Sequence, residues 1–197
     1  MNYCSIDIET CGIDEDKCDI IEFGAVLDDL REMAPVSSLP TCHCYFINEF
    51  YTGEPQALAM HPVIFQRIAD RTDGYTYVHA HKFGNMFKKF LVDNGYRSER
   101  DRVTITAAGK CFAAFDLQFL KRKTDLCKHV NIRSRVIDPA ILFLEPEDHV
   151  VPGLTTCLER AGVRDPEVKH NALSDAFDVV KIIRVAIGEA FCDEVRI

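Results

Sequence analysis

Alternating apolar and polar residues predict a strand directly after the N-terminus. Residues 4–9 alternate in this way, with Asp7 and Glu9 at polar positions, before Gly12 interrupts the pattern. Successive side chains of a strand point to opposite faces, so the two carboxylates share one face at the end of an apolar strand. Like charges held next to a core are costly unless a cation lies between them. The same residues also fit a strand with a solvated polar face, and partners elsewhere in the chain decide between the two interpretations.

The hydrophobic pattern predicts the remaining elements in turn. Further strands are predicted at 20–27, 41–48, 103–109 and 135–138, and helices from residue 61, over 80–94, 115–123, 153–161 and 172–191. Prolines and serines between 34 and 40 indicate a loop, and residues 50–60 are interpreted as a second loop. Five residues recur at helical spacing within 80–94 and are assigned to the core: Phe83, Met86, Phe87, Phe90 and Leu91.

This order of elements predicts an α/β fold in one domain that spans residues 1–197. Short connections between the first three strands favour antiparallel pairing. The last two strands follow helical crossovers, which favour parallel pairing. We therefore expect a mixed five-stranded sheet, with three antiparallel strands plus two parallel ones, flanked by helices.

Composition agrees with a packed domain. The chain has 47% hydrophobic and 27% charged residues, which is typical of a globular protein and unlike a disordered one. No basic and apolar leader and no run of about 18 apolar residues is present, so a cytoplasmic location without membrane contact is expected. Nine scattered cysteines lack the spacing of a disulfide framework and are interpreted as reduced core residues. Alternation places His43 opposite Cys42 and Cys44, which disfavours a zinc site there.

The net charge of −8 argues against a broad surface that grips phosphates. It does not exclude nucleic acid, because a cluster of acidic metal ligands adds to the negative charge. The cations that such a cluster binds reverse the local field, and a phosphodiester is then attracted to it.

Two further acids follow predicted elements in places that favour a site. Asp116 lies at the start of a helix after the strand at 103–109, near the carboxyl edge of the sheet, where parallel crossovers collect ligands. Asp175 lies early in the last helix. A helix would turn His170 and Asp175 apart, so His170 is assigned to the preceding loop with Asn171 as the N-cap. Asp138 precedes proline and is assigned to a turn.

Three segments resemble, in order, the signature of the DEDDh 3′→5′ exonucleases, a family on a ribonuclease H-like fold that includes proofreading exonuclease subunits, oligoribonucleases and RNase T. They are Asp7-x-Glu9-Thr10-x-Gly12, the stretch 109–120 that contains Asp116, and His170-x-Ala172 followed by Asp175. The resemblance extends from residue 5 to about residue 180. The family usually has Asn where this chain has Cys111.

The resemblance implies that Asp7, Glu9, Asp116 and Asp175 hold two divalent cations and that His170 is the general base. Hard oxygen ligands suit Mg²⁺ or Mn²⁺, and a metal pair roughly 3.5–4 Å apart stabilises the attacking and leaving oxygens of an in-line displacement. A histidine with a pKa near 6.5 can accept a proton at neutral pH. The expected product is a 5′-mononucleotide released from a single-stranded 3′ end.

The resemblance also implies substrate contacts. Thr10, Gly12 and Ile13 would line the terminal nucleotide, with backbone groups on its sugar and Ile13 against the base. Met60 and His61 would approach the substrate strand, although His61 equally fits the first residue of a helix.

The leading hypothesis is therefore a metal-dependent 3′→5′ exonuclease that acts on DNA, RNA or short oligonucleotides. A non-catalytic accessory protein that keeps the fold is one alternative, and an endonuclease on the same architecture is another. Retention of all the acids speaks against the first, and the loop-borne His170 speaks against the second. A homodimer or a non-covalent replication or repair partner is left open.

Overall fold

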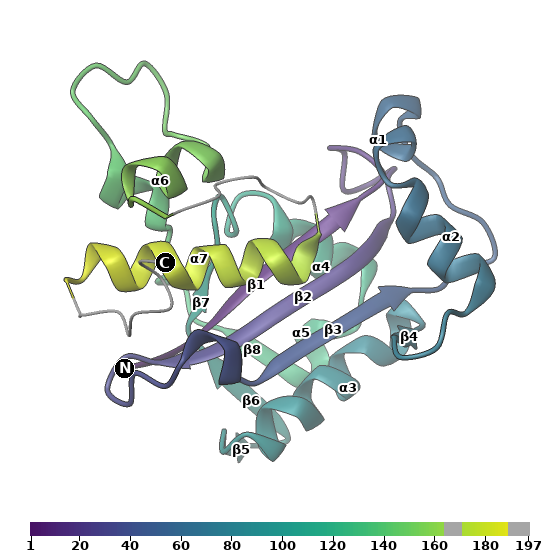
Figure 1. Cartoon of the computed structure of the whole chain (residues 1–197). Coiled ribbons are helices and arrows are strands. Elements are labelled where there is room, and N and C mark those ends of the chain that lie inside the picture. The colour runs from purple at the N-terminus through teal and green to yellow at the C-terminus, as the bar shows by residue number, and fades with distance from the viewer. Residues whose placement is uncertain (164–170, 189–197) are drawn as a thin grey trace.

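A five-stranded mixed sheet forms the centre of the computed structural model, which describes residues 1–163 and 171–188. The strands lie in the order β4-β3-β2-β1-β7 (Figure 1). They are β1 (Asn2–Thr10), β2 (Ile20–Asp29), β3 (Thr41–Phe46), β4 (Thr76–Val78) and β7 (Ala107–Ala108). The pairs β1–β2 and β2–β3 are antiparallel, whereas β1–β7 and β3–β4 are parallel. The predicted sheet of three antiparallel and two parallel strands is confirmed.

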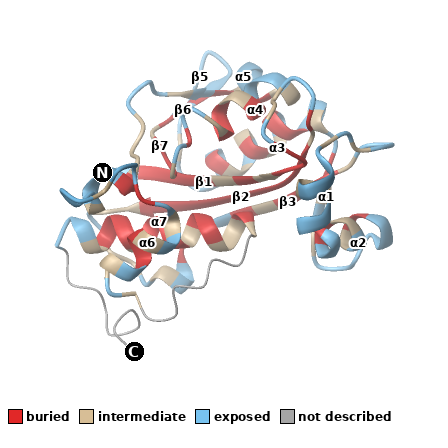
Figure 2. Cartoon of the chain, turned by 90° about the horizontal axis from the view of Figure 1, so that it is seen from above, coloured by how far each residue is buried: buried red, intermediate tan, exposed pale blue. Residues whose placement is uncertain are grey.

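Helices cover both faces of this sheet (Figure 2). One face carries α6 (Leu154–Arg160) and α7 (Ala172–Ala186), and the other carries α3 (Ala80–Asp93), α4 (Asp116–Lys123) and α5 (Leu126–His129). Two short helices, α1 (Pro55–Met60) and α2 (Pro62–Asp70), lie together at one end of the strands. A small second sheet, in the order β5-β6-β8, contains β5 (Ser98–Glu99), β6 (Arg102–Ile105) and β8 (Val130–Ile132). The 3-10 helices are η1 (Val36–Ser38) and η2 (Pro139–Phe143).

The core follows from the alternation of β1 and β2. Ile6 and Ile8 face the core that contains the aromatic residues of α3. Phe23 on β2 packs edge-on against Phe83 and Phe87, with ring centroids 4.7 and 5.0 Å apart. The predicted assignment of this aromatic stripe to the core is confirmed, and the opposite face of β1 and β2 is left for α7.

The contact between α7 and the sheet is unusually close at Gly24. A Cβ atom at this position would lie 2.3 Å from the backbone of Ala172 and Leu173, so only glycine allows the first turn of α7 to rest on β2. Near the other end of α7, Arg184 forms a two-pronged, buried ion pair with Asp28 at 2.5 and 3.0 Å. The helix is therefore fixed at both ends to the same strand.

Four predicted elements were wrong in extent or type. The strand predicted at 103–109 divides, because β6 pairs with β8 while β7 pairs with β1. Residues 135–138 form one isolated bridge, between Ala108 and Ile137, and the fifth strand is instead β4, which was not predicted. Residues 55–60 form α1, although a loop was expected at 50–60. The last helix was predicted at 172–191, but α7 ends at Ala186, and residues 189–191 lie outside the described residues.

Asp138 was expected in a turn and precedes a 3-10 helix, and most cysteines in the described segments are buried, as expected. Asp138 caps η2 by accepting a hydrogen bond from the Ala140 backbone nitrogen at 3.0 Å. Eight cysteines in the described segments are free, six of them buried, although Cys111 and Cys127 are exposed. Within residues 1–163 and 171–188, no helix is long and apolar enough to cross a membrane.

Candidate functional site

Three carboxylates meet on the face of the sheet that α7 covers. Asp7 and Glu9 extend from the last part of β1, and Asp175 extends from the first turn of α7. One ligand oxygen from each of the three lies within 4.8 Å of the others. The alternation of β1 and the placement of α7 on β2 are what bring these residues together from opposite ends of the chain.

Asp116 reaches the same strand from its neighbouring edge. It lies in the first turn of α4, and its Oδ1 accepts a hydrogen bond from the Ile8 backbone nitrogen at 3.2 Å, between Asp7 and Glu9 in sequence. It is not within the 4.8 Å group. Asp116 and Asp175 both lie in the first turn of a helix, where the helix dipole favours negative charge.

Burial is the main reason why these acids hold their protons tightly. Burial, together with the charges of Asp175 and other nearby carboxylates, raises the pKa of Glu9 to about 8. The pKa of Asp175 rises to about 7 through burial and then through Asp178 and Glu22.

The Asp7 and Asp116 carboxyls show the same behaviour. Burial raises the pKa of Asp7 well above its usual range, and the charge of Asp116 adds most to this effect. Burial raises the pKa of Asp116 to about 7, although backbone hydrogen bonds and the Lys110 ammonium oppose the rise. Four acids in such a site are ionised together only when positive charge is supplied.

The donor set fits a hard divalent cation. Oδ1 of Asp175 is buried and has no hydrogen-bond partner in the described part of the chain, which leaves a lone pair free for a ligand. In those same segments, no lysine or arginine forms an ion pair with any of the four acids. Clustered carboxylate oxygens without cationic side chains are the ligands that Mg²⁺ and Mn²⁺ prefer.

A cleft of about 400 Å³ opens beside Glu9. Its lining includes every residue for which the sequence predicted a substrate contact: Thr10, Gly12, Ile13, Met60 and His61. Ile13 and Met60 are 75% and 53% exposed, so they offer apolar surface to a ligand. The Thr10 hydroxyl instead donates to the Gly12 carbonyl at 2.7 Å and so fixes the loop that forms the wall.

Sequence reasoning missed part of this wall. Glu54, Gln56 and Ala57 also line the cleft, as does Phe115. The first three belong to or precede α1, a helix of six residues whose N-cap side chain makes no capping hydrogen bond. The only sequence signal was Pro55, a residue type favoured at the first helical position.

His61 lines the cleft and lies between the two short helices. It is the C-cap of α1 and the N-cap of α2, and its side chain makes no cap hydrogen bond. It is also 94% buried, with Nε2 3.6 Å from Oε2 of Glu9. His61 therefore links the short helices to the acidic group.

The predicted general base, His170, lies outside the described residues. The neighbouring prediction is confirmed, because the Asn171 side chain caps α7 by accepting from the Ser174 backbone nitrogen at 3.2 Å.

Cys111 adopts a left-handed backbone conformation with φ of 57°. Asparagine tolerates this conformation better than most residues. The Cys111 nitrogen donates to Asp138 at 3.0 Å.

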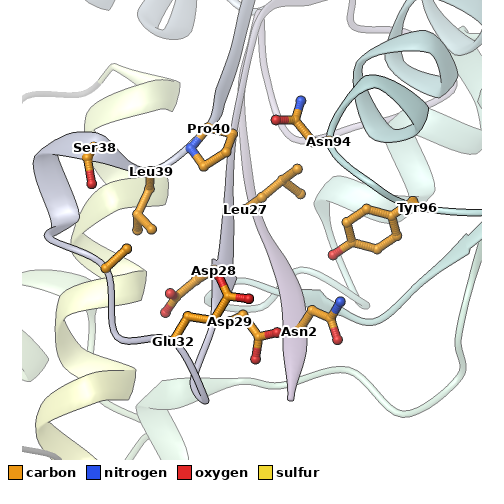
Figure 3. A pocket seen from close by; sticks show the side chains of 11 residues that line it. Asn2, Leu27, Asp28, Asp29, Glu32, Ser38, Leu39, Pro40, Asn94 and Tyr96 are labelled. Atoms are coloured by element: carbon orange, nitrogen blue, oxygen red, sulfur yellow. The ribbon is translucent and has the colours of Figure 1, made fainter.

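A second acidic cavity, of about 210 Å³, lies at the opposite end of β1 and β2 (Figure 3). Two of its three carboxylates differ from those of the site because they have cationic partners. Asp28 is paired with Arg184, and Asp29 is paired with Arg31 and with the N-terminal amine. Among residues 1–163 and 171–188, the acids that lie close enough together to hold a metal ion are Asp7, Glu9 and Asp175, at the other end of β1.

Neither a family model nor a curated protein matches this chain. Solved structures of exonuclease I share its fold. One aligns with a TM-score of 0.61 at 13% identity, over 93% of this chain and 40% of that chain. E. coli exonuclease I in complex with a 5cy-dA13 oligonucleotide aligns at 0.58 and 14%, over 93% and 40%. The zinc-bound E. coli enzyme with single-stranded DNA aligns at 0.57 and 13%, over the same shares.

The chain thus spans about 40% of the length of these neighbours. At this identity the likeness shows the fold, and it confirms the predicted ribonuclease H-like α/β class.

Proposed function

We propose that this chain is a metal-dependent 3′→5′ exonuclease that hydrolyses phosphodiester bonds at single-stranded 3′ ends and releases 5′-mononucleotides. Asp7, Glu9, Asp116 and Asp175 are the proposed ligands of two divalent cations, and His170 is the proposed general base.

One observation carries the proposal. Acids from β1, α4 and α7 converge beside an open cleft, are buried or partly buried, and lack lysine or arginine partners in the described segments. A protein that used these acids only for its structure would neutralise them with cationic side chains, as it does for Asp28. The solved complexes of exonuclease I with single-stranded DNA, one of them bound to zinc, support the same substrate class and a divalent cation here.

Bound divalent cations would supply positive charge for the transition state of phosphoryl transfer. The chain itself would orient the substrate. Ile13 would offer an apolar contact to the terminal base and Met60 one to the substrate strand, and the loop fixed by Thr10 would bring backbone groups to the sugar. An imidazole at His170 would accept the proton of the attacking water at neutral pH.

The test is digestion of a 5′-labelled single-stranded oligonucleotide with Mg²⁺ or Mn²⁺. We expect a ladder that shortens from the 3′ end, and no ladder from Asp7→Ala or His170→Ala. Asp73→Asn, at an exposed acid that neither lines the cleft nor belongs to the acidic group, serves as the matched control and should retain activity. Matched DNA and RNA substrates of about 5 and about 20 nucleotides identify the preferred substrate.

A circular single strand separates the proposal from an endonuclease, because it has no 3′ end and should stay intact. Cleavage of the circle would overturn the exonuclease assignment. A ladder that persists in both variants would contradict the assigned site, and calorimetric Mn²⁺ uptake that is equal in the wild type and in Asp175→Ala would contradict the assigned ligands.

A further inference from the structure

One more acid, Glu22, lies behind the site and belongs to none of the three motifs. It is on β2 directly opposite Glu9 in the register, and its side chain is completely buried. Burial of a carboxylate is costly unless hydrogen bonds compensate for the lost water. Glu22 therefore needs partners.

The Glu22 carboxylate has three partners within hydrogen-bond distance. His43 Nε2 lies 2.6 Å from Oε1, Asn171 Nδ2 donates to Oε1 at 2.8 Å, and the Ala172 backbone nitrogen donates to Oε2 at 3.1 Å. The last two groups can only donate, which fits an ionised carboxylate that accepts from all three.

These contacts hold the beginning of α7. Asn171 is the N-cap and Ala172 is the first residue of the helix. Glu22 therefore accepts hydrogen bonds from the N-cap side chain and from the first backbone nitrogen of the helix. Gly24, two residues further along β2, provides the close backbone contact described above. Asp175 lies within the first turn that is fixed in this way.

His43 is itself held in place. Its ring packs edge-on against Tyr45 and Tyr75, with centroids 5.2 and 5.9 Å away. The Arg67 guanidinium lies over the Tyr75 ring at 4.8 Å and donates to the Tyr45 hydroxyl at 2.7 Å. The orientation of the Glu22 carboxylate thus depends on a packed group of side chains.

We propose that Glu22, oriented by His43, is a positioning residue that sets the place of Asp175 relative to Asp7 and Glu9. The inference rests on the proposed function, since it assigns Glu22 a role in the geometry of the same site. Residues that orient metal ligands typically change metal affinity or activity about 10- to 100-fold when they are mutated.

The experiment compares three variants of the full chain. Glu22→Ala should lower kcat and Mn²⁺ affinity by about 10- to 100-fold while the KM for an oligonucleotide changes less than about threefold. Glu22→Gln should recover only part of the loss, because the amide oxygen can still accept from Ala172 and the amide nitrogen can face the other tautomer of His43, but that nitrogen cannot accept from Asn171.

Ser5→Ala is the matched control. The Ser5 hydroxyl donates to the Ala176 carbonyl at 2.8 Å, so its removal also breaks a buried hydrogen bond between the sheet and α7 without changing an acid. We expect Ser5→Ala to keep kcat and Mn²⁺ affinity within about threefold of the wild type.

Each outcome decides the question. Loss of kcat and Mn²⁺ affinity that is equal in Glu22→Ala and Ser5→Ala would overturn the positioning role and leave only a role in stability. A Glu22→Ala variant that does not fold leaves the decision to Glu22→Gln, whose kcat must then fall more than that of Ser5→Ala. If the wild type binds Mn²⁺ but cleaves nothing, the proposed function fails while the Mn²⁺ affinities still test Glu22. If it binds no Mn²⁺, both proposals fail.

Discussion

Substitution of Glu9 by glutamine should stabilise the metal-free protein, and the gain should depend on pH. Burial and neighbouring acids raise the pKa of Glu9 from 4.5 to about 8 in the folded chain. Between these two values the folded state retains a proton that the unfolded chain releases, so the free energy of unfolding falls as pH rises. Glutamine has the same shape and no such titration.

The magnitude follows from the two pKa values. A rise from 4.5 to about 8, at about 1.4 kcal/mol for each pKa unit, corresponds to about 5 kcal/mol. Rearrangement of water and of the nearby acids relieves part of this penalty, so we expect Glu9→Gln to gain about 2 to 5 kcal/mol at about pH 9. The gain should vanish near pH 4.5, where both states begin to hold the proton, and should level off above about pH 8.

Urea unfolding in the presence of EDTA, at about pH 5, about pH 7 and about pH 9, measures this difference. The substitution Glu147→Gln, at an exposed residue, is the control and should show no such trend. Addition of Mn²⁺ should narrow the difference, because a ligand at about 100 times its Kd stabilises the wild type by about 2.7 kcal/mol and glutamine removes one of its contacts. A Glu9→Gln protein that is less stable than the wild type at high pH in EDTA, or a difference that is constant with pH, would refute the reasoning.

Three further substitutions test the frame around the site. Gly24→Ala places a Cβ atom 2.3 Å from the backbone of α7 and should lower the free energy of unfolding by more than about 2 kcal/mol, whereas Gly153→Ala, with open space around it, should change it by less than about 0.5 kcal/mol in the same urea titration. Arg184→Met leaves Asp28 buried without its ion pair and should lower the free energy of unfolding by about 3 to 5 kcal/mol. The double variant that also carries Asp28→Asn should regain part of this loss. Cys111→Asn relieves a left-handed residue with φ of 57° and should raise the thermal midpoint slightly, by less than about 1 kcal/mol in stability; a lower midpoint would contradict the backbone argument.

Local patterns of apolar residues, and the order of the motifs, explain what the sequence could predict. The alternation in β1 is a local property, and it correctly placed Asp7 and Glu9 on one face because the other face is fully buried in the core. The helical spacing of Phe83 and Phe87 is equally local, and the structure confirms it. Placement of Asp116 and Asp175 near β1 rested on the order of the motifs, and the structure brings both residues to that strand.

Pairing between distant segments was harder to predict. The strands β4 and β7 have three and two residues, too short for a pattern, and each exists because a neighbouring strand offers free backbone groups. The run 103–109 looked continuous because it holds only apolar or small residues and threonines, without a charge or a proline to interrupt it. Its two halves pair with different sheets, a division that depends on partners elsewhere in the chain.

The helix α1 was missed for a related reason. Six residues form fewer than two turns, and such a helix is stabilised by its tertiary contacts rather than by its own sequence. Its residues Gln56 and Ala57 complete the cleft beside Glu9. Part of the candidate binding surface was therefore invisible until the fold was known.

Glu22 had a sequence signal that its local pattern concealed. The stretch 20–27 is apolar apart from Glu22 and predicts a buried strand. A single glutamate in such a strand is easily taken for a residue that reaches solvent. Both faces of β2 are covered, however, by α3 on one side and by α7 on the other, so a carboxylate there has no access to water and must find donors. Three such donors are present, and two of them belong to the start of the helix that carries Asp175. An acid in a fully apolar strand thus indicates a buried hydrogen-bond partner at long range, and here that partner is the element that closes the site.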